Sequence, residues 1–315
     1  MNETVNSANP GSIPITTPIF DGVDPVTLCT PEAERAVVLY RDGLGFQIAS
    51  ESQWPASPWR QIWELPDGPD LSVVELRKPK AHGGGIRIVS VPELPTVSGG
   101  RLPNQPGPYA WDFYVRDMNA AVERITKLGW TFRSEPQKYP LFGQDFEVTE
   151  VMLEGPQGLL HALVEYIPGQ HRCVLGVDPD EDTSEVIALV VCVESITAPK
   201  AAMAEGLSGD IAMDEKFSGA EVERLINLPP GSEFQMVLFR GPTRRSARFE
   251  LLESIGGSTI TGPIPHVIAP MPFADLPAAI AALRAHGVEV TDPVATALGP
   301  VATADLASGI ILELR

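Results

Sequence analysis

The sequence predicts an α+β fold made of four copies of one β-α-β-β-β unit. Two observations predict it: a Leu-Gly-aromatic turn, or a close variant, follows a helix-like segment four times, and strand-like runs surround each copy. The turns recur roughly every 80 residues, and self-similarity at a fixed period indicates one supersecondary unit repeated along the chain. They are Leu44-Gly45-Phe46, Leu128-Gly129-Trp130, Leu207-Ser208-Gly209 and His286-Gly287-Val288.

The first unit begins with a short apolar strand and a helix whose start is visible in the sequence. Thr30 is a suitable N-cap, and Pro31 fits the first helical turn. Apolar side chains then recur at helical spacing on one face, so we expect this face to pack against a sheet. They are Ala33, Ala36, Val37, Tyr40 and Leu44.

Three strand-like runs, residues 46–50, 59–65 and 71–76, follow this helix and complete the unit. Turns rich in Pro, Asp and Gly separate them, as expected between neighbouring strands. The stretch 78–108 is rich in Pro and Gly and is longer than an ordinary loop, so we expect part of it to cover a site.

The other three units repeat this order. The second unit starts at Tyr109 and contains a predicted helix at 119–128. Its later strands, and the first and last strands of units three and four, are predicted at 146–153, 159–166, 186–193, 247–252, 267–273 and 309–314.

Two units per domain divide the chain of 315 residues into two domains of ordinary size. We expect a flexible arm at 1–18, an N-terminal domain at 19–168, an acidic linker at 169–184 and a C-terminal domain at 185–315. The carboxylates of the linker are expected to be solvated, since runs of like charge usually face water.

Charge and composition exclude several kinds of partner. The net charge of -18 leaves no basic face for phosphates, so we expect neither nucleic acid nor a membrane as a partner. The N-terminal segment lacks the basic and apolar regions of a signal peptide, and no apolar run approaches the ~18 residues that span a bilayer. We therefore expect a cytoplasmic monomer or homodimer in which Cys29, Cys173 and Cys192 are reduced.

The four units resemble the vicinal oxygen chelate superfamily, which includes glyoxalase I, bleomycin resistance proteins and extradiol dioxygenases. The resemblance rests on the motif LYRDGLGF and on closing strands that read GLLHALVEY, ARFELLE and GIILEL, and it covers nearly the whole chain. It implies that two units pair so that curved mixed sheets enclose a cavity. It also implies a divalent metal, held by one residue on each first strand and a Glu on each last strand. The reaction stays open, because the superfamily includes isomerases, lyases, dioxygenases and binding proteins.

In the N-terminal half, most of the ligand positions that the resemblance implies hold other residues. The first-strand position of unit one falls at Pro25, whose side chain cannot bind a metal, and the last-strand position falls at Glu75. In unit two both positions, Ala110 and Ala162, are alanines. His161 would be a ligand only if the register shifted by one residue, since alternate residues of a strand face opposite sides.

The C-terminal half matches the Glu positions better. Glu250 and Glu313 fall on the last strands of units three and four, and His266 lies near the start of unit four. These side chains can hold a divalent ion, or the two Glu residues remain in a site that no longer binds one. The expected cofactor is therefore none or a single divalent metal ion. Extradiol cleavage is not expected, because no pair of His residues falls on the family's His positions.

A metal-free site is the other possibility. If Ala110 faces a cavity, alternation points Asp112 and Tyr114 the same way, and the same rule places Glu75 and Arg77 on one face of their strand. Together they would supply a carboxylate base, a phenol and a guanidinium that hold an oxyanion. In the alternative interpretation, Arg77 pairs with a carboxylate at the rim and Tyr114 only lines the wall.

Aromatic residues indicate where a ligand would bind. All five Trp and all five Tyr lie before the acidic linker, and ligand pockets are mostly apolar and aromatic. We expect Trp54, Trp59 and Trp63, together with Val73, to line a pocket for a hydrophobic or aromatic small molecule. Ordinary core packing is the alternative.

The sequence therefore predicts an enzyme of isomerase or lyase type that moves a proton on a hydrophobic or aromatic oxygenated compound, with Glu75 or Asp112 as the base. Two other functions remain open: a ligand-binding or sequestering protein of bleomycin-resistance type, and a divalent-metal enzyme that uses the C-terminal site.

Overall fold

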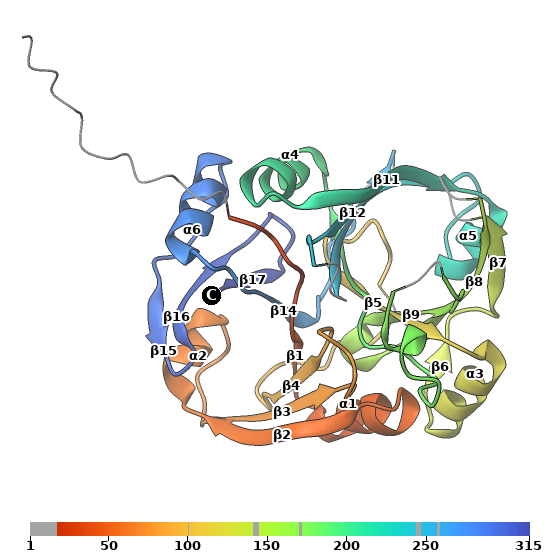
Figure 1. The fold of residues 1–315 in the computed structure, drawn as a ribbon, viewed down its shortest axis with the longest axis horizontal. Helices are drawn as coiled ribbons and strands as arrows, with labels where there is room; N and C mark the ends of the chain where they lie inside the picture. The colour runs from red at the N-terminus through yellow and green to blue at the C-terminus, as the bar shows by residue number, and fades with distance from the viewer. Residues whose placement is uncertain (1–17, 100, 141–144, 170–171, 244–246, 257–258) are drawn as a thin grey trace, which may run out of the picture.

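The computed structural model describes residues 18–99, 101–140, 145–169, 172–243, 247–256 and 259–315. The predicted N-terminal arm, apart from residue 18, lies outside these ranges. The described chain forms two curled mixed sheets with short helices, which confirms the α+β prediction (Figure 1). None of the helices within these ranges is long and apolar enough to cross a membrane.

Each sheet curls around its own interior (Figure 1). In spatial order, sheet 1 consists of β15 (Val294–Thr296), β16 (Gly299–Ala304), β17 (Ile311–Leu314), β14 (His266–Met271), β1 (Val26–Thr30), β4 (Ile86–Ser90), β3 (Leu71–Arg77) and β2 (Gln47–Trp54). Sheet 2 consists of β11 (Asp210–Ser218), β12 (Glu233–Arg240), β13 (Arg248–Ile255), β10 (Ala188–Val193), β5 (Gly107–Val115), β9 (Leu160–Glu165), β8 (Glu147–Glu154) and β6 (Thr131–Phe132), with β7 (Gln137–Pro140) paired to β8.

The sheets join units that are distant in the sequence. β1 of unit one pairs antiparallel with β14 of unit four, and β5 of unit two pairs antiparallel with β10 of unit three. The expectation that consecutive units share one curved sheet is therefore wrong. The repeat alone cannot distinguish the two arrangements, because every unit begins with a similarly apolar strand. The domain limits given above remain a prediction.

Most helices lie on the outer faces of the sheets. They are α1 (Ala33–Val38) with its continuation η1 (Leu39–Gly43), α3 (Met118–Lys127), α4 (Thr197–Ala201) with η4 (Ala202–Gly206), and α6 (Leu276–Ala285); the short turns are η2 (Pro156–Gly158) and η3 (Val174–Gly176). One hydrophobic core joins these helices to the outer strand faces of both sheets. Ala36, Tyr40 and Leu44 of the predicted apolar stripe are fully buried in it. The two sheets thus share a core, which leaves their inner faces free to differ.

Two helices lie inside the sheets. α2 (Ala56–Ile62) packs against β15 and β16 in sheet 1, and α5 (Ala220–Ile226) packs against β7 and β8 in sheet 2. The prediction of a strand at 59–65 is therefore wrong: Trp59, Ile62 and Trp63 recur at helical spacing. The missing strand is β4, which lies within the stretch 78–108 that resembles a connection because of its Pro and Gly content.

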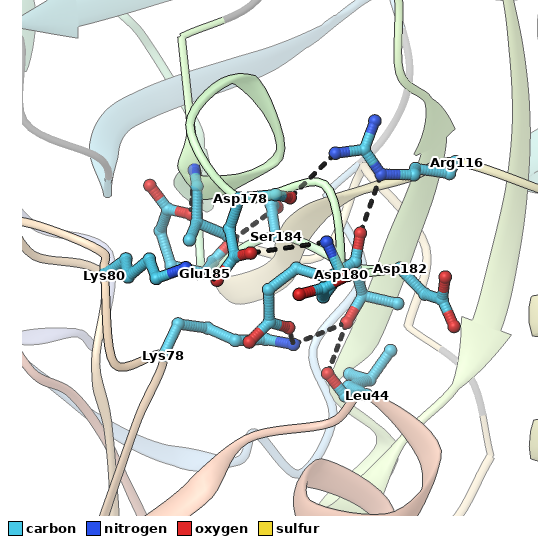
Figure 2. A network of polar contacts seen from close by, with 12 residues as sticks. Leu44, Lys78, Lys80, Arg116, Asp178, Asp180, Asp182, Ser184 and Glu185 are labelled. Carbon is cyan, nitrogen blue, oxygen red and sulfur yellow. Dashed lines mark hydrogen bonds and ion pairs between the residues drawn. The ribbon is translucent and has the colours of Figure 1, made fainter.

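Part of the acidic linker is docked against unit one (Figure 2). Lys78, which follows β3 and is buried, donates to Glu181 at 2.6 Å and to the hydroxyl of Thr183 at 3.0 Å. Lys80 forms an ion pair of 2.9 Å with Asp178. The expectation of solvated carboxylates is wrong for Asp178 and Glu181, which meet two lysines from unit one, whereas Asp180 and Asp182 are exposed as expected. The linker thereby ties the end of β3 in sheet 1 to the segment that enters β10 in sheet 2.

Candidate functional site

Sheet 2 curls around a cavity of about 170 Å³ with a mostly apolar wall. Its strands supply most of the lining, and α5 contributes Val222, Leu225 and Ile226. Several polar side chains also line the cavity: Tyr109, Asp112, Tyr114, Tyr139, Glu150, Arg248 and Glu250.

Strand alternation places these polar groups. On β5, Asp112 faces the cavity, whereas Trp111 and Phe113 point to the other side and are buried in the shared core. On β13, Arg248 and Glu250 face the cavity in the same way. The sequence prediction of the inward face of β5 is therefore confirmed for Asp112.

One cation and one phenol are held together at the cavity wall. Nη2 of Arg248 donates to the hydroxyl of Tyr114 at 3.2 Å, and its Nε donates to the carbonyl oxygen of Ile187 at 3.1 Å. On another strand, the hydroxyl of Tyr139 donates to the carboxylate of Glu150. These contacts fix a guanidinium and a phenol on one side of the cavity and a hydrogen-bonded carboxylate on the other strand.

Two carboxyl groups of the cavity have no hydrogen-bond partner within the described ranges. Asp112 and Glu250 lie close enough for their charges to interact, yet no described donor reaches either of them. Tyr109 is 2% exposed, and its buried hydroxyl also has no partner in the described part of the chain. Since buried polar groups in proteins nearly always have partners, unpaired groups around a cavity indicate a place for a ligand.

Burial changes the acidity of all three carboxyl groups in the cavity. Burial raises the pKa of Asp112 well above its usual value, and the charges of Glu250 and Glu150 raise it further. Burial raises the pKa of Glu250 to about 8, against the opposing effect of Arg248. It raises the pKa of Glu150 to about 7, against the hydrogen bond from Tyr139. Carboxyl groups with pKa values near neutrality can both accept and return a proton.

The structure does not bring Glu75 and Arg77 to this cavity. Both lie on β3 of sheet 1, where Glu75 accepts from Arg87 at 2.9 and 3.0 Å and Arg77 donates to Asp24 at 2.8 Å. The predicted four-residue site is wrong because unit one pairs with unit four, not with unit two. The pairing of Arg77 with a carboxylate matches the alternative interpretation.

The predicted substrate-binding residues fill sheet 1 and do not line the cavity. The rings of Trp54, Trp59 and Trp63 pack on one another with centroid distances of 4.6, 4.8 and 5.6 Å. Trp59, Trp63 and Val73 are at most 1% exposed. Core packing is therefore the correct interpretation, because α2 carries two of these rings into the interior of the sheet.

The predicted metal ligands Glu250, His266 and Glu313 do not meet. Glu250 lies in sheet 2, whereas the other two lie in sheet 1. Within sheet 1, Glu313 pairs with Pro270 and not with His266. The indole of Trp63 donates to Glu313 at 2.8 Å, and Nε2 of His266 contacts the carbonyl oxygen of Trp63 at 2.7 Å. Both side chains serve the packing of α2.

His161 is a core residue on the outer face of β9. Its Nε2 lies 2.9 Å from the hydroxyl of Tyr40, and the rings of Trp111 and Phe113 pack against it. Burial lowers the pKa of His161 to about 4. The unshifted strand register is therefore correct, and His161 points away from the cavity.

The side chains present do not fit the divalent metal that the resemblance implies. Its ligand positions in sheet 2 hold three alanines and one carboxylate, since the first-strand position of unit three falls near Ala188. These are Ala110, Ala162, Ala188 and Glu250. In sheet 1, Arg87 binds Glu75 and Trp63 binds Glu313, so neither carboxylate is available. Across the described residues, no group of three His, Cys, Asp or Glu side chains is arranged to hold an ion.

Four polar residues of the cavity were not found from the sequence: Tyr109, Tyr139, Glu150 and Arg248. Arg248 stands two positions before Glu250, so strand alternation alone would have placed both on one face. Glu150 likewise alternates with the lining residues Val148 and Met152. Tyr139 lies on β7, a strand of four residues without a recognisable pattern.

Comparisons with known proteins agree with this architecture. Residues 22–160 match the family described as the Glyoxalase/Bleomycin resistance protein/Dioxygenase superfamily. Glyoxalase I from Zea mays is similar over 93% of this chain and 91% of its own, with a TM-score of 0.63 and 12% identity. A putative dioxygenase from Bacillus subtilis is similar over 94% of this chain and 85% of its own, with a TM-score of 0.62 and 15% identity. At such identities the likeness concerns the fold alone. No curated protein sequence matches the chain.

Proposed function

Because residues 22–160 of this chain match the Glyoxalase/Bleomycin resistance protein/Dioxygenase superfamily, we propose that the cavity of sheet 2 is the active site of an isomerase or lyase. Its substrate is a compact, largely apolar molecule with a carbonyl or hydroxyl oxygen, and the reaction is a proton transfer. The observation that carries this proposal is the pair of unpartnered carboxyl groups, Asp112 and Glu250, in an apolar cavity.

The side chains around the cavity have complementary roles in such a reaction. Glu250, whose pKa is about 8, or Asp112 accepts a proton from a carbon next to the carbonyl group. The guanidinium of Arg248 and the hydroxyl of Tyr114 hold the oxygen on which negative charge then develops. Returning the proton to a neighbouring atom completes an isomerisation, and loss of a leaving group completes an elimination.

We propose that this chemistry needs no metal ion. The support is the set of side chains at the implied ligand positions of sheet 2, where three alanines offer no donor atom. Elemental analysis of the purified protein, before and after treatment with a chelator, tests this point. One divalent ion per chain, lost together with activity, would contradict it.

A direct test of proton transfer does not require the natural substrate. The protein is incubated in D₂O with monocyclic ketones and aldehydes such as acetophenone and phenylacetaldehyde, and exchange of the α-hydrogen is followed by proton NMR. We expect exchange to fall by about 10² to 10⁴ in Glu250→Gln or Asp112→Asn, the usual contribution of a general base. Glu215→Gln, an exposed carboxylate on the same sheet, is the matched control.

Two outcomes would redirect the proposal. Exchange that is unchanged in both variants would show that neither carboxyl group is the base. Tight binding of these compounds by the natural protein without any exchange would instead favour the sequestering function, which the mostly apolar cavity also supports.

A further inference from the structure

We propose that the cavity of sheet 2 selects a compact ligand that carries a cationic nitrogen, such as a protonated primary amine on a single ring, and rejects an anion of the same size. This inference rests on the proposed function and specifies its substrate class. It comes from the shape of the cavity, from the balance of charged groups that line it, and from the hydrogen bonds that those groups lack.

The cavity has an apolar end and a polar end. Phe217 and Phe234 stack with a centroid distance of 5.7 Å, and both line the cavity beside α5. Glu250 pairs with Leu238 in the ladder between β12 and β13, so it lies further along the strands than Phe234. A ligand therefore meets apolar walls with one end and carboxyl groups with the other.

The volume of the cavity matches a ligand of about one ring. An apolar cavity of about 150 Å³ binds a benzene molecule. The cavity here, about 170 Å³, thus accommodates one six-membered ring with a short polar substituent. Larger fused or conjugated ligands would extend out of the cavity.

Among the described residues that line the polar end, acidic groups outnumber basic ones. Asp112, Glu150 and Glu250 line the cavity together with one cation, Arg248. Arg248 already donates to Tyr114 and to a backbone carbonyl, whereas Asp112 and Glu250 have no donor among the described residues. The carboxyl groups of this site therefore lack hydrogen-bond donors. An ammonium group supplies three N–H donors together with a positive charge.

An anion would be unfavourable in the same place. Once Glu250 is ionised, above a pH of about 8, an anion would lie beside a carboxylate, and like charges within a few ångströms in a cavity repel strongly. A cation instead replaces the proton on Glu250, whose pKa of about 8 makes that exchange easy near neutral pH. The resulting ion pair is a charge-assisted hydrogen bond, stronger than a neutral one.

Calorimetry with three molecules of matched size tests the inference: benzylamine, benzyl alcohol and benzoate. We expect benzylamine to bind at least about 10-fold more tightly than benzyl alcohol, since a hydrogen bond between charged groups contributes about 1.5 to 3 kcal/mol. Above pH 8, where Glu250 is ionised, benzoate should bind most weakly. The affinity for benzylamine should rise between pH 6 and pH 8 as Glu250 loses its proton, and the affinity for benzyl alcohol should not.

Variants assign this preference to the carboxyl groups. Glu250→Gln should weaken benzylamine binding about 10-fold or more and leave benzyl alcohol binding nearly unchanged. Asp112→Asn provides the same test if the first variant fails to fold, and Glu215→Gln, exposed on β11, should change neither affinity. Stronger binding of benzoate than of benzylamine, or equal binding of benzylamine and benzyl alcohol, overturns the inference.

The remaining outcomes separate this inference from the proposed reaction. If none of the three molecules binds, the cavity is not a site for such ligands and both proposals are wrong. If benzylamine is preferred but α-hydrogen exchange is unaffected by Glu250→Gln and Asp112→Asn, the proposed reaction is wrong and the ligand class stands.

Discussion

The two sheets have the same construction and opposite interiors. In each, a short helix lies inside the curl and stands between the second and third strands of one unit: α2 between β2 and β3, and α5 between β11 and β12. α2 carries the large rings of Trp59 and Trp63 into sheet 1, which is packed, whereas α5 carries Val222 and Leu225 into sheet 2, which keeps a cavity. The size of the side chains on one helix thus decides whether the interior is core or site.

The carboxyl groups inside the two sheets also differ, in whether the protein supplies their hydrogen-bond partners. In sheet 1, Arg87 donates to Glu75, and the indole of Trp63 donates to Oε2 of Glu313, while Oε1 of Glu313 lies 3.5 Å from the guanidinium of Arg315. In sheet 2, Asp112 and Glu250 have no described donor and face open space. Sheet 1 therefore uses its inner carboxylates for stability, and sheet 2 keeps them available to a ligand.

Removing an inner ring should show how differently the two helices are used. Trp63→Ala deletes a fully buried indole and leaves Glu313 without its donor, so we expect a loss of about 3 to 5 kcal/mol in the free energy of unfolding. Leu225→Ala, its counterpart beside an existing cavity, should cost about 2 kcal/mol, the low end for such a deletion. Urea unfolding followed by circular dichroism measures both. Equal losses would mean that the two interiors are packed alike.

The connection between the sheets is the next largest expected effect. Lys78→Met removes the buried cation that binds Glu181 and Thr183. The carboxylate of Glu181, which is mostly buried, is then left with only partial hydration. We expect a loss of about 2 to 3 kcal/mol, somewhat less than for a fully buried pair. Lys80→Met breaks a more exposed pair with Asp178 and should cost less than about 0.5 kcal/mol. A similar cost for both variants would argue against linker docking.

Whether a feature of this fold could be predicted from the sequence depends on how far apart in the chain the residues that determine it lie. Local patterns were enough for the four units and for the inward face of β5, because helix and strand periodicity repeat within a few residues. The pairing of β1 with β14 and of β5 with β10 depends on contacts between distant, equally apolar strands, and no local pattern encodes it. Placing Glu75 beside Asp112 was wrong for that reason.

The tryptophans show a second limit. A cluster of three Trp residues in ten positions has a composition that fits the wall of a ligand pocket and equally a packed hydrophobic core. Only the helical spacing of Trp59, Ile62 and Trp63 separates the two, and it extends over a single turn. The cavity lies instead where the corresponding helix, α5, has smaller side chains. The absence of large rings from an interior is not a pattern that a sequence displays.

Filling the cavity should convert sheet 2 into a second packed sheet. Leu225→Trp on α5 places a ring where α2 carries its own, and we expect a change of about 1 to 3 kcal/mol in stability, as for other enlarged core residues. Binding of benzylamine should be lost by calorimetry. Leu225→Met, which conserves volume, should retain it. Undiminished binding in the Trp variant would place the ligand elsewhere than this cavity.

The last expected effect is a pH dependence of stability, which an unpaired buried carboxyl group such as Glu250 should cause. Burial raises the pKa of Glu250 to about 8 in the folded protein from an ordinary value near 4.5 in the unfolded chain, so the folded state binds the additional proton. Stability from this group is full below about pH 4.5 and is lost as the pH rises through 8. At pH 9, Glu250→Gln should therefore be more stable than the natural protein by at least about 1.4 kcal/mol, the equivalent of a tenfold change in protonation.

Thermal unfolding of both proteins between pH 5 and pH 9 measures this difference, with Glu215→Gln as the exposed control. The gain should disappear in saturating benzylamine, because the bound cation stabilises the ionised carboxylate of Glu250 and leaves the amide of the variant without an ion pair. A variant that is equally stable at pH 5 and pH 9 relative to the natural protein would mean that Glu250 is already satisfied within the fold. Sheet 2 would then resemble sheet 1 in its charges and differ from it only in the space that α5 leaves open.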